Sequence, residues 1–377
     1  MRSHKLRLPG LSHPRRKQAA NPPSAAPTPG AWGGAHQLAQ VLALALFLSL
    51  LLLSASSPSL RGAAEESPQS AAPHSPLFRA SPHCAATDLS AAPAAAPPQW
   101  VQSGVYNGEA LLDFALGVPA TGSLTAEWMA SAGGVWAPIE TMIFLHVLGA
   151  PKVRHFSRLV VDVGANMGYF SQVALKMGYE VLAFEPQRRA QPFLAATAAR
   201  NGGSQRLHLH ACAVGAVQGA VTMSESAQWE VSVNEGLVGG QAGGPAAAAP
   251  AAAVPMVALR DLLIPGVPIA LLKIDVEGFE RGVFAGLTPE VLAGVRNIVV
   301  EVKTGESREH IMRLLGDAGF HCRQYTEKYR ERFDFKLPPA ELASNMAQHL
   351  LPCTSADPED YWWTREEFPW QCGAVGC

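Results

Sequence analysis

The chain has 377 residues, of which 16% are charged, and its formal net charge at pH 7 is −2. This near-neutral balance, without a basic stripe interleaved with aromatic side chains, does not support a nucleic-acid partner. The six cysteines include no C-x-x-C pair, so the usual zinc spacing is absent. Among them, Cys212 is expected to be a small buried hydrophobe, and Cys353, Cys372 and Cys377 could form a disulfide in an oxidising compartment.

The N-terminal residues have the features of a targeting segment. Residues 1–37 form a basic tail without acidic residues, and residues 38–55 are an apolar run rich in Leu and Ala. Because the basic flank precedes the run, the positive-inside rule favours a transmembrane signal anchor, with the following domain in the lumen of the Golgi or endoplasmic reticulum. A cleaved signal peptide and a chloroplast or mitochondrial transit peptide are the alternatives. Residues 56–98, rich in Pro, Ala and Ser, are predicted to be a disordered stalk.

The remainder of the chain divides by composition into three parts. Residues 99–157 regain aromatic and aliphatic side chains and are predicted to form an N-terminal helical cap. Residues 158–326 are predicted to form the main domain, with a low-complexity Gly/Ala/Pro insertion at 236–253. Residues 327–377 are a C-terminal extension. Its aromatic residues could pack in the core or in a lid, or they could stack on a substrate. These residues are Tyr361, Trp362, Trp363, Phe368 and Trp370.

Strand-like and helix-like runs alternate in the main domain. This alternation is typical of an α/β fold with a doubly wound, mostly parallel sheet and crossover helices. The predicted strands are 159–163, 180–184, 207–214, 269–275, 297–302 and 321–325. The predicted helices are 168–177, 188–200, 279–286 and 308–318. Right-handed crossovers would place the carboxyl ends of the strands along one edge of the sheet, where we expect the site.

The stretch LVVDVGANMGYFS predicts a strand, a tight glycine turn and a helix start. Gly164 and Gly168 allow the backbone to approach a ligand closely, as in folds that receive nucleotide-derived cofactors after their first strand. The spacing, D-x-G-x-N-x-G through Asp162 and Asn166, differs from the dinucleotide pattern G-x-G-x-x-G. Glu185 ends the next strand about 20 residues later, where an acidic residue can bind both ribose hydroxyls. Alternatively, Asp162 only caps the turn, and Glu185 is a solvated carboxylate in a loop.

A second candidate stretch is LLKIDVEGFE. In a strand, Lys273, Asp275 and Glu277 would share one face, and burying three charges there is costly unless they pair or meet a ligand. They could form ion pairs that only hold the strand end. Alternatively, they face a substrate hydroxyl, with a carboxylate as general base and the lysine stabilising the developing oxyanion. Glu301, in NIVVEV, is expected near the same edge, and no metal ligand is predicted.

The motifs VDVGANMGYFS, AFEPQ, ACAVG, LLKIDVEGFE and NIVVEV, in this order over residues 156–325, resemble the FkbM-type S-adenosylmethionine-dependent methyltransferases. The resemblance implies a class I, Rossmann-like methyltransferase fold and S-adenosylmethionine as the methyl donor. It also implies methyl transfer to a hydroxyl of a glycan or small molecule. In the order of the motifs, the cofactor loop falls on Asp162, Gly164, Asn166 and Gly168. The ribose ligand falls on Glu185, and the acidic motif beside the reaction centre falls on Asp275 and Glu277.

Two functions of other classes stay open from the sequence. A nicotinamide-dependent oxidoreductase could use a similar fold, but the missing G-x-G-x-x-G pattern disfavours it. A catalytically inactive methyltransferase-like adaptor would keep the pocket only for structure, and the intact acidic residues disfavour it. We therefore expect an enzyme that meets the membrane through residues 38–55.

Overall fold

The computed structural model describes the following residues: 77–87, 89, 99–106, 111–119, 129, 134–223, 252–303, 305–325, 350–353 and 360–366. All of them fall in the second of the chain's two units, Ala71–Cys377. The predicted basic tail, the predicted anchor at 38–55 and most of the predicted stalk and insertion lie outside these residues. Within the described part, no helix combines the length and apolar character needed to cross a membrane.

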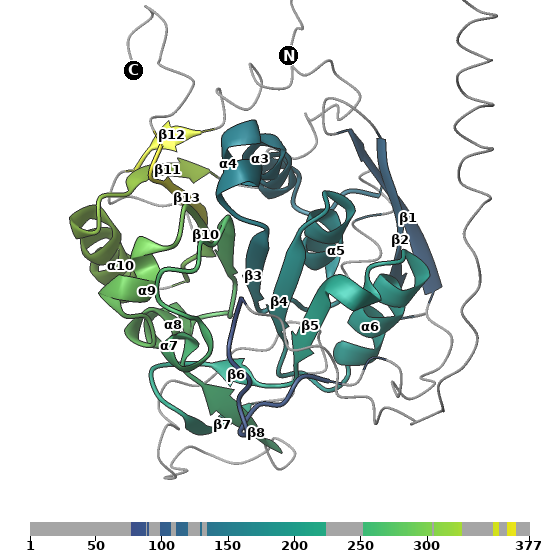
Figure 1. Cartoon of the computed structure of the whole chain (residues 1–377), viewed down its shortest axis with the longest axis horizontal. Coiled ribbons are helices and arrows are strands. Elements are labelled where there is room, and N and C mark those ends of the chain that lie inside the picture. Colours follow the sequence, from purple (N-terminus) through teal and green to yellow (C-terminus); the bar gives the residue numbers. More distant parts are fainter. Residues whose placement is uncertain are drawn as a thin grey trace, which may run out of the picture. The chain divides into compact units, whose positions relative to one another are not determined.

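The central element is an eight-stranded sheet with the order β12-β11-β13-β10-β9-β3-β4-β5 (Figure 1). Its strands are β3 (Leu159–Val163), β4 (Glu180–Phe184), β5 (Leu207–His210), β9 (Leu271–Ile274), β10 (Asn297–Glu301), β11 (His321–Tyr325), β12 (Leu351–Pro352) and β13 (Asp360–Thr364). From β10 to β5 all neighbouring strands run parallel, whereas β13 is antiparallel to both β10 and β11. The predicted α/β fold with a mostly parallel sheet is confirmed.

Burial on both faces explains why the first strand of the sheet is apolar throughout. All five residues of β3 are buried. Because successive side chains of a strand point to opposite faces, Val160 packs into one hydrophobic cluster and Val161 into another. The first cluster includes Ile143 of a helix in the N-terminal cap, and the second includes Phe284, which lies near the other face. Strand β3 is therefore the centre of a core with two layers.

The helices and a small sheet complete the main domain. The helices are α5 (Tyr169–Lys176), α6 (Gln191–Arg200), α7 (Leu259–Leu262), α8 (Glu280–Ala285), α9 (Pro289–Ala293) and α10 (Gly305–Asp317). The small sheet has the order β6-β8-β7, with β6 (Ala213–Val214), β7 (Gly219–Met223) and β8 (Ala252–Val257). The predicted strand 207–214 is thus two strands, and the end of the predicted insertion 236–253 belongs to β8, because Ala253 pairs with Thr222.

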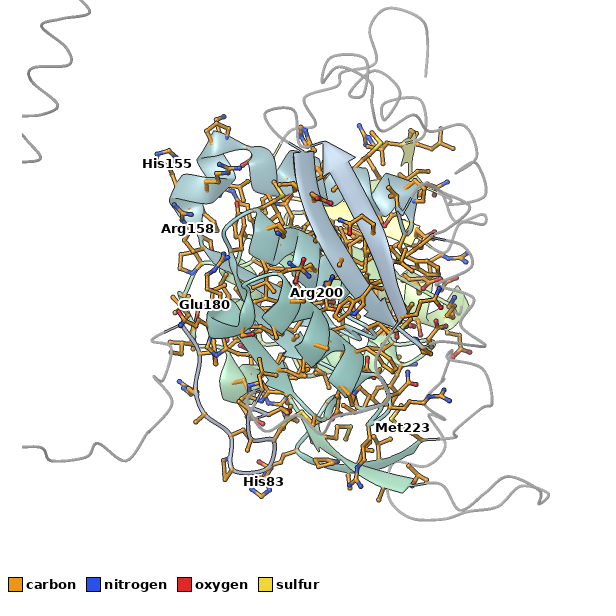
Figure 2. The ribbon with its side chains drawn as sticks, turned by 90° about the vertical axis from the view of Figure 1, so that its right-hand side faces the viewer. His83, His155, Arg158, Glu180, Arg200 and Met223 are labelled. Atoms are coloured by element: carbon orange, nitrogen blue, oxygen red, sulfur yellow. A yellow bond between two sulfur atoms is a disulfide. The ribbon has the colours of Figure 1, made fainter. Side chains whose placement is uncertain are left out.

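The described part of the predicted helical cap, residues 99–157, combines a hairpin with helices. Its first half is an antiparallel hairpin of β1 (Gln99–Tyr106) and β2 (Leu111–Val118), and its helices are α3 (Pro138–Gly149) and α4 (Pro151–Phe156). The hairpin contacts α6, since Asn201 at the end of that helix accepts from the Ala115 N–H and donates to its carbonyl. Arg200 places its guanidinium 4.4 Å from the centre of the Trp100 ring (Figure 2). These long-range partners stabilise extended backbone where a helix was expected.

The predicted C-terminal extension contributes two strands, β12 and β13, to the central sheet. Strand β13 lies between β10 and β11, and its Tyr361, Trp362 and Trp363 are buried. The indole N–H of Trp362 donates to Asn297 Oδ1 at 3.3 Å. The structure therefore favours core packing over substrate stacking for these three aromatic residues. Phe368 and Trp370 lie outside the described residues.

Two disulfides lie within the described part of the chain, and they correct the cysteine predictions. Cys212 bonds to Cys84, so it is not a free buried hydrophobe. Cys353 bonds to Cys322, whereas Cys372 and Cys377 lie outside the described residues. The two pairs are separated by 128 and 31 residues along the chain, and spacing alone could not indicate either of them.

Candidate functional site

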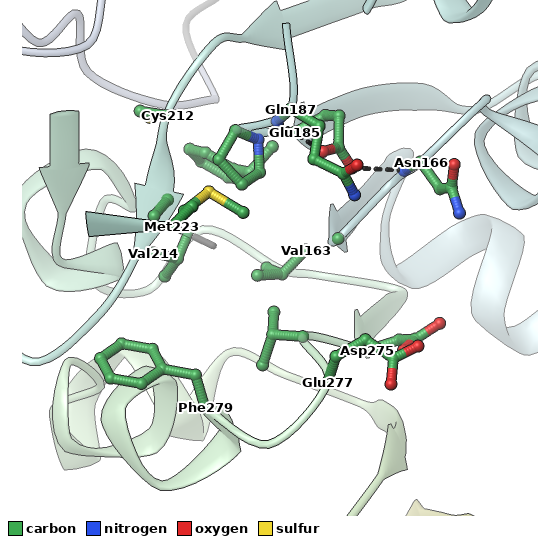
Figure 3. Close-up of a pocket in the computed structure, with 15 residues that line it drawn as sticks. Val163, Asn166, Glu185, Gln187, Cys212, Val214, Met223, Asp275, Glu277 and Phe279 are labelled. Carbon is green, nitrogen blue, oxygen red and sulfur yellow. Dashed lines mark hydrogen bonds between the residues drawn. The ribbon is translucent and has the colours of Figure 1, made fainter. Parts of the chain in front are cut away.

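A cleft with about 600 Å³ of empty space lies at the carboxyl ends of β3, β4 and β9. Five segments line it: the turn after β3, the end of β4, the residues from Cys212 through β6, the end of β7, and the loop after β9. Figure 3 shows an apolar side with Met223 and Phe279, and a polar side with Asp275 and Glu277. The cleft is at the sheet edge that the alternation of strands and helices predicts.

The glycine turn after β3 brings two loops of the cleft together. Gly164 has a φ of +81°, and a Cβ there would collide with the carbonyl oxygen of Asp275. A residue without a side chain is therefore needed where the first and fourth parallel strands meet. Asn166 also has a positive φ of 50°, and its buried Oδ1 lacks a hydrogen-bond partner among the described residues. Asn166 is among the residues that line the cleft.

Glu185 is fixed at the end of β4 by backbone donors. The side chain is buried, its Oε2 accepts from the Asn166 N–H at 2.6 Å, and its Oε1 accepts from the Gln187 N–H at 2.8 Å (Figure 3). Burial raises the pKa of Glu185 to about 7, although these two N–H groups partly offset the effect. The carboxylate lines the cleft and keeps free lone pairs for a second set of donors.

The apolar side of the cleft comes mainly from segments to which the sequence assigned no site role. Phe184, Val214, Met223 and Phe279 line it. Phe279 falls inside the LLKIDVEGFE stretch, so its position was visible in the sequence. Met223 ends β7, which lies at the cleft only because the small sheet packs there, and no local pattern indicates that. A flat apolar ring would fit between such side chains.

Lys273 lies behind the cleft, between two acidic side chains. It is 2% exposed, and its Nζ is 3.1 Å from Asp275 Oδ2 and 4.0 Å from Asp162 Oδ1. Burial alone would lower the pKa of Lys273, but these two carboxylates outweigh it and raise the pKa above its ordinary value. Lys273 therefore stays charged. Since it does not line the cleft, it holds Asp275 rather than contacting a substrate.

Asp275 and Glu277 approach each other in a loop, not on one face of a strand. Strand β9 ends at Ile274, and Glu277 has a positive φ of 53° in the following turn. One carboxylate oxygen from each of Asp275, Glu277 and Glu301 lies within 4.8 Å of the other two. Such a trio could hold a metal ion, but lysines are already present among these groups. Lys303 Nζ lies 2.5 Å from Glu301 and 3.4 Å from Glu277.

The proton distribution in this group follows from its charges. Burial, and then the charges of Asp275 and Asp360, raise the pKa of Glu301 to about 10. Burial would also raise the pKa of Asp275, but Lys273 and a hydrogen bond with Glu301 hold it below its ordinary value. Of the two, Glu301 therefore binds a proton more readily, and Asp275 stays ionised to lower pH. Lys303 follows Glu301 by two residues, so the alternation of side chains along a strand could have placed the two on one face. Asp360 comes from β13, and no local sequence pattern indicates that it lies near Glu301.

The structure separates the predicted site residues into two groups. Gly164, Asn166, Glu185, Asp275 and Glu277 all line the one cleft. The remaining three predicted residues lie behind it, and these are Asp162, Gly168 and Lys273.

The roles of Asp162 and Gly168 are structural in the observed geometry. Asp162 is buried and its Oδ2 accepts from the Ser171 hydroxyl at 2.6 Å, which favours the turn-capping alternative. Gly168 precedes α5 with a φ of +87°, and a Cβ there would press against Leu194. Neither residue lines the cleft in this structure, and their place in the cofactor loop stays a prediction.

Comparison with known proteins gives one family match and several weak structural matches. The family model described as "Methyltransferase FkbM domain" matches residues 162–322. No match was found among curated protein sequences. A methyltransferase FkbM structure from Methylobacillus flagellatus is 14% identical, with a TM-score of 0.32. The match covers 53% of this chain and 56% of that one, so the chain spans little more than half of its length.

Two further solved structures are methyltransferases by their descriptions. A SAM-dependent methyltransferase from Agrobacterium tumefaciens is 10% identical, covers 75% of this chain and 77% of its own, and has a TM-score of 0.35. A SAM-dependent O-methyltransferase from Thermotoga maritima is 12% identical, covers 73% and 80%, and has a TM-score of 0.32. At these scores the identification rests on the family model. Residues 162–322 match this family model, which confirms the resemblance seen in the order of the motifs.

Proposed function

We propose that the chain is an S-adenosylmethionine-dependent O-methyltransferase that acts on a hydroxyl of a glycan or small molecule. The observation that carries this proposal is a single cleft with two unlike ends. Glu185 and an apolar wall lie at one end, and an ionised Asp275 beside Glu277 lies at the other. The first end suits a nucleoside, and the second suits a hydroxyl group that must lose its proton.

The residues of the cleft fit S-adenosylmethionine in two respects. Glu185 presents a fixed carboxylate to which a ribose diol can donate. The wall with Phe184, Met223 and Phe279 suits a purine ring.

The proposed chemistry asks little of the protein beyond alignment and one proton transfer. When bound, S-adenosylmethionine supplies a methyl group on a positively charged sulfur, which is already a strong electrophile. Asp275 then orients the acceptor hydroxyl and takes up its proton. Lys273 keeps Asp275 ionised and in place, and the proton on Glu301 prevents two adjacent carboxylates from repelling each other. Glu277 is the second candidate for the hydroxyl contact.

The compartment is part of the proposal. Two disulfides support an oxidising environment such as the Golgi or endoplasmic reticulum lumen, which agrees with the predicted signal anchor at residues 38–55. A transit peptide would instead deliver the domain to a chloroplast or mitochondrion. Tagging the C-terminus with a fluorescent protein and testing protease protection in intact vesicles separates these two outcomes. A tag digested without detergent would contradict the lumenal placement.

The experiment that tests the activity has two stages. First, isothermal titration calorimetry with S-adenosylmethionine and S-adenosylhomocysteine is expected to show one binding site. Second, incubation with the methyl-labelled donor and a panel of glycans, lipids and small phenols is expected to label a hydroxyl-bearing acceptor. Absence of donor binding would refute the proposal. Labelling only on nitrogen or sulfur would keep the methyltransferase and refute the hydroxyl acceptor.

A further inference from the structure

Residues 77–87, which we call the strap, precede the family domain and lie along the outer edge of β5. Ala86 bridges to His210 in antiparallel fashion, and the Thr87 N–H donates to the Leu209 carbonyl at 2.6 Å. The Cys84 carbonyl accepts from His210 Nδ1 at 2.7 Å. The strap therefore extends the parallel half of the central sheet by one short, irregular pairing. His83, labelled in Figure 2, belongs to this segment.

The strap is also fixed at its other end. Phe78 bridges to Leu263, and the Arg79 N–H donates to the Leu262 carbonyl at 2.7 Å. The Phe78 ring lies 4.8 Å from the ring of His208, in an edge-to-face arrangement. The strap thus spans from β5 to the end of α7, and the disulfide between Cys84 and Cys212 joins it covalently to the segment between them.

Two of the residues that anchor the strap, His210 and Cys212, connect it to the cofactor end of the cleft. Cys212 itself lines the cleft, followed by Ala213 and Val214 (Figure 3). The carbonyl of His210 accepts from the Glu185 N–H at 3.1 Å, and the His210 ring is 5.3 Å from the Phe184 ring. Through His210 and Cys212, the strap therefore supports the part of the cleft wall formed by Cys212, Ala213 and Val214.

We propose that the strap is required for tight binding at the cofactor end of the cleft. The Cys84–Cys212 disulfide holds the wall at Cys212–Val214 and the end of β4 in the shape that binds S-adenosylmethionine. Breaking this bond therefore lowers cofactor affinity, while the rest of the domain keeps its fold. Cys84 and His210 are positioning residues, because they act through Glu185 and the wall. This inference rests on the proposed function and adds a dependence on an oxidising compartment.

The redox step is thiol–disulfide exchange. An external dithiol would reduce the bond, so Cys84 and Cys212 each gain a hydrogen as thiols and the dithiol becomes a disulfide. Cys84 is 4% exposed and Cys212 is 0% exposed, so the strap must open before a reductant can reach either sulfur. The bond is thus protected while the strap is closed.

A matched pair of double variants tests the proposal. The first double variant, Cys84→Ala with Cys212→Ala, removes the strap disulfide. The second, Cys322→Ala with Cys353→Ala, removes the disulfide between β11 and the residue after β12, which lies at the opposite end of the central sheet. Donor affinity is measured by calorimetry and the midpoint of thermal unfolding by calorimetric scanning. We expect the first variant to bind S-adenosylmethionine about tenfold more weakly, and the second to stay within about twofold of the wild type.

The outcomes separate the two proposals. Failure of the wild type to bind the donor overturns the proposed function and this inference with it. Wild-type binding with unchanged affinity in the Cys84/Cys212 variant overturns only the inference, as does an equal loss in both variants. A loss of thermal stability without a loss of affinity would show a merely structural disulfide.

A second measurement covers the case in which the first variant does not fold. Hydrogen–deuterium exchange on the wild-type chain is followed with and without S-adenosylhomocysteine. The Thr87 amide, which donates to β5, is expected to exchange several-fold more slowly in the bound protein. Unchanged exchange throughout residues 77–87, with slower exchange at Glu185, would contradict the coupling.

Discussion

The two ends of the cleft hold their carboxylates by different means. Glu185 is held by two backbone N–H groups, and no cation among the described residues offsets its burial, so its pKa rises to about 7. Asp275 lies 3.1 Å from a buried lysine, and its pKa is held below the ordinary range despite burial. The proposed cofactor end therefore positions its carboxylate by backbone hydrogen bonds, whereas the proposed acceptor end positions its carboxylate by pairing it with a charged lysine.

The largest expected effect is at the acceptor end. Asp275→Asn keeps the size of the side chain but removes the proton acceptor, so we expect kcat to fall about a thousandfold. Donor affinity should change by less than about fivefold, because the proposed donor contacts are at the other end. Steady-state kinetics and calorimetry measure the two quantities. A donor affinity that falls as far as kcat would show that the ends are not separate.

The next largest effect concerns the buried lysine. Lys273→Met leaves Asp162 and Asp275 without their shared cation, and we expect the free energy of unfolding to fall by about 3 kcal/mol. Urea unfolding measures it. Adding Asp162→Asn should restore part of the loss, because one unpaired carboxylate is then removed. If the single variant is as stable as the wild type, the charge pairing does not hold this end together.

Removing the carboxylate at the cofactor end should weaken donor binding about a hundredfold. Glu185→Ala deletes an acceptor for two hydroxyl groups, and hydrogen bonds to a charged group contribute about 1.5–3 kcal/mol each. Calorimetry with S-adenosylhomocysteine is the measurement. Glu290→Ala, at an exposed position in α9, is the matched control and should bind normally. Equal affinity in the two variants would contradict the ribose contact.

The raised pKa of Glu185 predicts that donor binding depends on pH. The ionised form accepts the ribose hydroxyls, so affinity at pH 6 should be about tenfold lower than at pH 8. Glu185→Ala should remove this dependence, which is the internal control.

The same shift has the opposite effect on the stability of the free protein. The folded state binds the Glu185 proton more tightly than the unfolded state, so this contribution to the free energy of unfolding falls as pH rises from about 4.5 to about 7. Buried Glu280, whose pKa is also raised to about 7 by burial, adds to this fall. Binding is therefore the cleaner readout for Glu185.

The smallest expected effect is that of metal removal. Lys273 and Lys303 already contact the carboxyl groups of Asp275, Glu277 and Glu301, so a divalent ion would have to compete with these lysines. Activity with a chelator should stay within about twofold of activity with added Mg²⁺. A larger loss that Mg²⁺ reverses would mean that the three carboxylates bind a metal ion in the working enzyme.

Much of the site was predictable because its signals are local. In a parallel sheet with crossover helices, the residue that ends each strand reaches the same edge, so Asp275 and Glu185 could be placed near each other from strand ends alone. The side of the turn that faces the cleft was not predictable. Asp162 was expected in the cofactor loop, yet it accepts from Ser171 behind the cleft. Strand periodicity also failed after Ile274, where the chain leaves the ladder.

The sequence by itself determined the parallel α/β core, the glycine turn, and the order of the acidic motifs, because each depends on residues close together in the chain. Only the tertiary structure decided which distant segments complete the site. Asp360 reaches Glu301 because β13 pairs with β10, and Cys84 reaches Cys212 across 128 residues. Such contacts arise from packing and have no short-range pattern, so they appear only when the chain is folded.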